Sequence, residues 1–136
     1  MDGLGLLLRQ GLSYRGGLFQ LAWVAHRIAG LGTLLFLTVH IVDTSLVFFA
    51  PELYNHAIKI YRNPFFGIGE IILVGCVLWH GLNGLRIAVS DWFPQLWAAK
   101  TQMRLVAATV VLFVLLFVPT AAYMAVTIVG RGLLGG

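Results

Sequence analysis

The sequence predicts an all-α membrane protein with three transmembrane helices, and three observations support this fold class. Hydrophobic residues make up 60% of the 136-residue chain and charged residues only 10%, against about a quarter in globular proteins. The mean hydropathy is +0.91. Three apolar blocks, 21–50, 65–91 and 103–129, each exceed the roughly 20 residues that a helix needs to cross a bilayer. No separate soluble domain is expected.

The first block is too long for a secretory signal, whose apolar region has about 7 to 15 residues. We therefore expect it to be a retained helix that opens a transmembrane domain at 21–136. The preceding residues, 1–20, mix leucines with Arg9, Arg15 and five glycines. They predict an interfacial or docking segment that does not span the membrane.

The second and third blocks are delimited by proline. Pro51 follows the first block, "RNPFFG" opens the second, and Pro94 ends it after two aromatic residues, as is typical of helix ends at a membrane interface. Pro119 lies inside the third block, where it predicts a kink that neighbouring helices can accommodate. The single cysteine, Cys76, has no partner for an internal disulfide and predicts only packing.

Basic residues predict a cytoplasmic N-terminus, because positive charge is retained on the cytoplasmic side during insertion. Six lie on the N-terminal side and three on the other: Arg9, Arg15, Arg27, Arg86, Lys100 and Arg104 against Lys59, Arg62 and Arg131. They are spread along the flanks with no dense patch, which argues against a nucleic-acid partner.

Ionisable residues inside the blocks are the candidate functional residues, since charge in hydrocarbon is costly. They are His26, Arg27, His40, Asp43, Glu70, His80, Arg86 and Asp91. At about 1.5 Å per residue, His80 lies roughly 16 Å from the inner edge at Asp91 and His40 roughly 27 Å from Ala22. The two histidines are then about 10 Å apart in depth.

The surroundings of His80 predict a haem site. At helical spacing it neighbours Cys76, Asn83 and Gly84, and the missing side chain of Gly84 leaves room for a flat group. Imidazole is a standard axial ligand of haem iron, and His26, Arg27 and Arg86 lie at the inner face where propionates need partners. A histidine that bonds a carbonyl of the next helix would give the same pattern.

The first block repeats His26, Thr33 and His40 every seven residues, so they share one helix face with Gly30. A large planar group fits along this face. The alternative is close helix packing, for which glycine and threonine at this spacing are also typical.

Two motifs resemble the cytochrome b membrane-anchor subunit of succinate dehydrogenase, respiratory complex II. They are "AHRIAG" at 25–30, with the family's His-Arg pair, and "LWHGLNGLRIAVSDW" at 78–92, with its His, Gly-[Ile/Leu]-Arg and Asp spacing. The resemblance covers about residues 20–95. It is greatest to the actinobacterial and related di-haem branch, where "VHIVD", "PELYN" and a Glu soon after "NPFFG" have counterparts.

The resemblance implies one half of a heterodimeric haem-binding helix bundle. His80 matches the axial ligand of the proximal haem b, whose opposite ligand comes from a second anchor subunit. The family's propionate and proximal quinone residues match His26, Arg27 and Asp91, with Arg86 beside them. Trp23 and Ile87 stand where many members have a quinone-contacting Ser and a His, which argues against a conventional proximal ubiquinone site.

In the di-haem branch, menaquinone reacts near the outer side, so the resemblance implies that His40 is the distal haem ligand. Asp43 and Glu70 would then carry protons to a distal quinone. Their alternative role is as interfacial carboxylates that contact water or the basic residues Lys59 and Arg62. We expect His56, in the outer connection, to be solvated.

The implied function is electron transfer from succinate to menaquinone or ubiquinone in the bacterial inner membrane. Succinate oxidation would belong to flavoprotein and iron-sulfur partner subunits, while this chain holds one or two haems b. The alternatives are a haem-free structural anchor, a fumarate reductase anchor, and an unrelated subunit of a transporter whose histidines carry protons.

Overall fold

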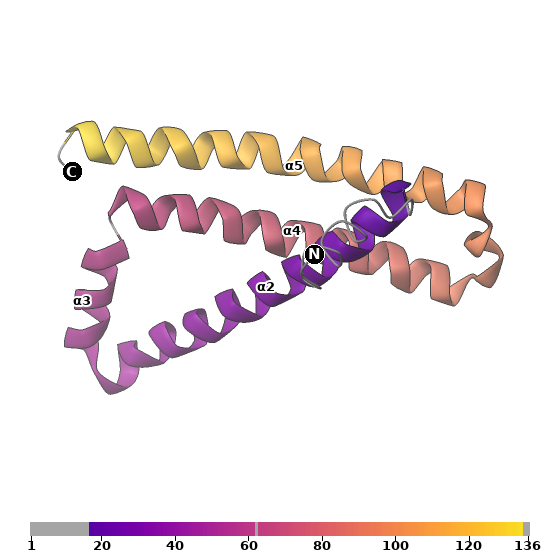
Figure 1. Ribbon diagram of the computed structural model, residues 1–136. Helices are drawn as coiled ribbons and strands as arrows, with labels where there is room; N and C mark the ends of the chain where they lie inside the picture. Colours follow the sequence, from indigo (N-terminus) through magenta and orange to yellow (C-terminus); the bar gives the residue numbers. More distant parts are fainter. Residues whose placement is uncertain (1–16, 62, 135–136) are drawn as a thin grey trace, which may run out of the picture.

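The computed structural model describes residues 17–61 and 63–134, which are almost entirely helical. Three long helices dominate: α2 (Gly17–Phe49), α4 (Pro64–Trp92) and α5 (Ala99–Leu134). The shorter helix α3 (Pro51–Tyr61) joins α2 to α4, and the 3-10 turn η1 (Pro94–Trp97) joins α4 to α5. Helices α4 and α5 run side by side in opposite directions, while α2 crosses α4 and diverges from it toward α3 (Figure 1).

The local sequence explains where helices α3 and α4 begin. The Asn63 side chain accepts a hydrogen bond of 3.0 Å from the backbone N–H of Phe65, and Pro64 occupies the first helical position. Both features favour a helix start, because proline lacks an N–H that would be unpaired there. Helix α3 likewise begins at a proline, with Glu52 in its first turn and Lys59 in its last, where each charge complements the helix dipole.

Glycines bring the long helices into close contact. A Cβ built at Gly32 would lie 2.8 Å from the Cys76 sulfur, and one built at Gly67 would lie 2.6 Å from Ile128. Gly75 packs in the same way against the ring of Phe117. Close approach at small residues is how helices associate in lipid, where hydrophobicity gives little drive for them to meet.

The pattern of burial is the reverse of that of a soluble protein. Among the described residues, the buried apolar side chains are small, such as Ala22 and Ala29, while large ones such as Leu31, at 70% exposure, face outward. The buried polar side chains are Asn83, Arg86, Ser90, Gln102 and Thr109. This surface needs lipid or other apolar partners to cover it, and the three long helices each have the length and hydropathy of a membrane span.

The structure confirms the predicted fold class of three transmembrane helices, and the helices agree closely with the three apolar blocks. Helix α2 begins at Gly17, four residues before the first block, so 17–20 continue the helix; the rest of the expected docking segment, 1–16, lies outside the described residues. Helix α5 runs unbroken through Pro119. The helix α3 in the connection between α2 and α4 was not anticipated from the sequence.

Candidate functional site

The imidazole rings of His26 in α2 and His80 in α4 stack face to face. Their centroids lie 4.2 Å apart and their planes differ by 6°. Both side chains are half-buried. The crossing of α2 and α4 therefore joins the two motifs singled out in the sequence, although 54 positions separate these histidines.

A second contact orients the ring of His80. Its Nδ1 lies 3.2 Å from the backbone carbonyl oxygen of His26. A carbonyl oxygen only accepts, so Nδ1 is the donor in this hydrogen bond, and the imidazole tautomer with its proton on Nδ1 has its lone pair on Nε2. Histidines that ligate metals usually have this arrangement. The same contact is also what the packing interpretation of His80 predicts.

A glycine of each helix lies against the stacked pair, and at Gly30 the absence of a side chain makes room for a ring. A Cβ at Gly30 would lie 3.0 Å from His80 Cε1 and 3.1 Å from its Nδ1, tighter than ordinary contact, so the missing side chain forms a cradle for the ring. At Gly84 a Cβ would lie 3.5 Å from His26 Cε1. Each imidazole thus rests against a glycine of the opposite helix.

Arg86 is turned toward α5 and is only 8% exposed. Its Nε donates to Asn83 Oδ1 at 2.9 Å, and its Nη1 donates to Gln102 Oε1 at 2.6 Å. Gln102 Nε2 in turn donates to Ser90 Oγ at 2.8 Å and to the carbonyl of Leu96 at 3.1 Å. The positive charge of Arg86 is therefore buried against neutral amide oxygens.

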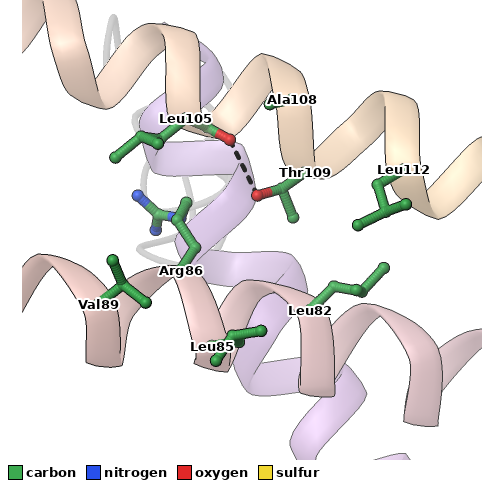
Figure 2. A pocket seen from close by; sticks show the side chains of 8 residues that line it. All are labelled: Leu82, Leu85, Arg86, Val89, Leu105, Ala108, Thr109 and Leu112. Atoms are coloured by element: carbon green, nitrogen blue, oxygen red, sulfur yellow. Dashed lines mark hydrogen bonds between the residues drawn. The ribbon is translucent and has the colours of Figure 1, made fainter.

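Arg86 also borders a cavity of about 230 Å³ between α4 and α5. Figure 2 shows leucines of both helices around it, with Arg86 between the two helices. The Thr109 hydroxyl, at its edge, donates to the Leu105 carbonyl of its own helix at 2.9 Å. The cavity is thus lined mainly by apolar side chains, with Arg86 and Thr109 as its polar residues.

Three buried polar atoms have no hydrogen-bond partner among the described residues: His26 Nδ1, Asn83 Nδ2 and Trp79 Nε1. Such atoms are uncommon because each costs roughly 1–3 kcal/mol when left unpaired. Two of them belong to the His80 neighbourhood, one on the stacked ring and one a turn along α4. The site therefore has hydrogen-bonding capacity that its described neighbours do not use.

The other candidate propionate and quinone residues, Arg27, Trp23 and Asp91, lie on the surface of the chain. The guanidinium carbon of Arg27 sits 4.2 Å from the centroid of the Trp23 ring, in a cation–π arrangement. Both side chains are exposed, and Asp91 is exposed in the last turn of α4. Asp91 lies about 16 Å along α4 from His80, so it does not adjoin the stacked pair.

His40 lies apart from the stacked pair. It is ten residues beyond Gly30, which places it about 15 Å farther along α2. Its ring is exposed and stacks on Phe36 at 5.5 Å between centroids. Helix α2 diverges from α4 in this half (Figure 1), and His40 lies on the surface of the chain.

The carboxylates of Asp43 and Glu70 differ in their contacts. Asp43 Oδ2 accepts a 2.7 Å hydrogen bond from the Tyr61 hydroxyl, which ties the end of α3 to α2. This bond raises the pKa of Tyr61 above its ordinary value, with burial and the charge of Asp43 adding to the effect. Glu70 is exposed on α4. His56 is exposed, and it lies on helix α3 and not in a loop.

Sequence reasoning missed three members of this region: Ser90, Gln102 and Tyr61. Ser90 had a recoverable signal, because Asn83, Arg86 and Ser90 are spaced by three and four residues and so share one helix face. Gln102 and Tyr61 had none, since their partners lie on other helices.

Among the described residues, no three His, Cys, Asp or Glu side chains gather to hold a metal ion. A haem iron does not need such a cluster, because each axial ligand is a single side chain.

Three spanning helices and a histidine pair held between the first two define a small integral membrane subunit with an intramembrane imidazole site. The family model for the succinate dehydrogenase/fumarate reductase transmembrane subunit matches residues 11–121. The chain is also 34% identical over 113 residues to succinate dehydrogenase 2 membrane subunit SdhC of Mycobacterium tuberculosis (strain ATCC 25618 / H37Rv), covering 83% of this chain and 82% of that protein. The chain belongs to this family, which confirms the resemblance.

Proposed function

We propose that this membrane-anchor subunit is the cytochrome b of a succinate:quinone oxidoreductase and holds haem b through His80. The observation that carries the proposal is the hydrogen bond from His80 Nδ1 to the His26 carbonyl. It leaves Nε2 as the free donor atom, in a ring oriented by both a hydrogen bond and a stacked neighbour. Oriented imidazoles of this kind are suited to axial ligation.

Other observations support the fit of a haem to these residues. Gly30 provides a cradle that a Cβ would fill, and His26 Nδ1 and Asn83 Nδ2 are buried polar atoms without described partners. When bound, haem b would supply a one-electron redox centre. His80 would hold its iron from one side, and the opposite ligand would come from a second membrane-anchor subunit.

The positions of the inner-face residues support their proposed contacts with propionates and quinone to different degrees. His26 is itself one of the stacked rings, Arg27 is the next residue of α2, and Trp23 and Asp91 are exposed near the same end of the bundle. Arg86 has the weakest support, because its guanidinium is directed to Asn83 and Gln102. In this proposal His26 and Arg27 supply the hydrogen bonds and positive charge, and Trp23 supplies an aromatic surface for a quinone ring.

We further propose that His40 ligates a distal haem together with a partner subunit. Its exposure on α2 supports a ligand shared across an interface. Asp43 and Glu70 would then carry protons to a menaquinone near the outer side. The Tyr61 hydrogen bond supports a defined position for Asp43, and the basic residues near the inner ends support a cytoplasmic N-terminus.

The exposed apolar surface of the three long helices supports assembly with a second anchor subunit in the bacterial inner membrane. Flavoprotein and iron-sulfur subunits would oxidise succinate and deliver electrons to the haem side. The family description names both succinate dehydrogenase and fumarate reductase, so the same anchor would serve the reverse reaction.

The test is the absorption spectrum of the purified complex before and after dithionite. We expect one or two b-type haems per flavin, and we expect His80→Ala to remove one of them. A complex that contains flavin and no haem would support the structural-anchor alternative and contradict the proposal. The absence of any associated flavoprotein would contradict the assembly as a whole.

A further inference from the structure

Hydrophobicity does not determine which face of α4 turns toward α5. Apolar side chains surround the helix, and several of them, such as Leu85 at 63% and Ile72 at 60%, face outward. In lipid, an apolar face gains little from leaving the bilayer to meet another helix. The rotation of α4 about its own axis must therefore be set by specific contacts.

The polar contacts of α4 lie on one stripe and converge on one residue of α5. Asn83 and Ser90 are fully buried and Arg86 is 8% exposed. Gln102, 4% exposed, accepts from Arg86 and donates to both Ser90 and the Leu96 carbonyl. One side chain of α5 thus holds the α4 stripe and the turn η1 together.

A second stripe of α4 contacts α2 and contains the candidate haem ligand. Cys76, His80 and Gly84 recur every four residues, and each meets α2, at Gly32, Gly30 and His26 respectively. At about 100° per residue, this stripe lies roughly 90° around the helix from the polar one. Because both stripes belong to one helix, a contact that fixes the first also fixes the direction of the second.

We propose that Gln102 is a positioning residue: by holding Arg86 and Ser90, it sets the rotation of α4 that directs His80 toward α2. The consequence for haem rests on the proposed function, whereas the rotation itself does not. Gln102 lies outside both sequence motifs and touches no atom of the stacked pair. It acts on His80 only through α4.

Cys76 provides a reporter of this rotation that needs no haem. It is the one cysteine of the chain, and a Cβ built at Gly32 lies 3.1 Å from its Cβ. A disulfide needs about 3.5–4.5 Å between the two Cβ atoms, so a small relaxation allows Gly32→Cys to form an intrachain cross-link. Mass spectrometry of the oxidised, assembled complex measures its yield.

In the Gly32→Cys background, we expect Gln102→Leu to lower the cross-link yield and to shift the reduced haem band. Gln102→Glu keeps the oxygen that accepts from Arg86 and should retain most of both signals. The matched control is Thr109→Val, because Thr109 is also buried on the α4 side of α5 but bonds only its own helix. This control should leave yield and spectrum unchanged.

Gln102→Leu leaves Arg86 Nη1 without its acceptor, so that Asn83 is the one remaining hydrogen-bond partner of this buried charge among the described residues, and this cost opposes assembly. The double variant Arg86→Met with Gln102→Leu avoids this, since replacing both partners of a buried polar pair is far less disruptive than removing one. It should assemble and still show the lower yield. An unchanged yield in the double variant would overturn the inference and assign the rotation to apolar contacts such as Trp79 with Phe113.

The outcomes for haem and for rotation can be told apart. A haem-free complex whose cross-link still depends on Gln102 would contradict the proposed function and support this inference. A haem-containing complex whose cross-link is indifferent to Gln102 would contradict this inference alone.

Discussion

Filling the cradle at Gly30 should weaken the histidine site by a predictable amount. In Gly30→Ala, the added methyl would lie 3.0 Å from His80 Cε1 and 3.1 Å from Nδ1, so the ring must move by a few tenths of an ångström. Overpacking of this kind costs about 1–3 kcal/mol, while alanine recovers roughly 0.5–1 kcal/mol of helix propensity. The net penalty of about 1 kcal/mol corresponds to roughly fivefold weaker haem retention.

Gly81→Ala is the matched control, because it lies next to His80 and a Cβ there meets no atom within 4 Å. It gains the same helix propensity without touching the ring. Haem retention is measured as the haem-to-flavin ratio after graded detergent washing of the purified complex. If Gly30→Ala and Gly81→Ala retain haem equally, the cradle does not orient His80 and the reasoning fails.

The remaining predictions concern the outer half of the chain and the inner surface. His40→Ala should remove one haem while the His80 haem stays; an unchanged haem count would refute the distal ligand. Tyr61→Phe should increase hydrogen exchange in α3, because the bond to Asp43 is lost, whereas the half-buried Tyr54 serves as a control through Tyr54→Phe. The raised pKa of Tyr61 means that its stabilisation is complete below the unfolded value near 10 and is lost as pH rises through the folded value; equal protection of α3, with exchange corrected for its intrinsic pH dependence, at pH 8 and well above 10 would contradict this. Arg27→Ala should lower quinone reduction with little effect on stability, since an exposed cation–π pair contributes only about 0.5–1 kcal/mol; unaltered quinone kinetics would remove Arg27 from the site.

The long helices were predictable because a bilayer imposes a length and a composition that can be counted in the sequence. Pro64 and Asn63 even mark the start of α4 correctly. Helix α3 was missed because, at 11 residues, it is too short for that argument. Its own signals were a proline at the first position and charges of the favoured sign at each end, which are weaker than a span of 20 apolar residues.

The histidine site was predictable in its members and not in its geometry. His26 and His80 were both candidates because ionisable residues in a span are costly, yet nothing in the sequence indicates that their rings stack. That depends on where α2 crosses α4. Arg86 shows the same limit: its position suggested the inner face, whereas its bonds to Asn83 and Gln102 depend on α5.

Chemical rescue of a His80→Gly variant tests the central claim most directly. The substitution removes the imidazole and leaves a cavity that free imidazole can enter, so the ligand can be removed and returned in one sample. We predict that electron paramagnetic resonance of the oxidised complex loses one low-spin haem signal and regains it when imidazole is added. A low-spin signal that persists unchanged in His80→Gly would show that the iron has another ligand on this side and would contradict the account.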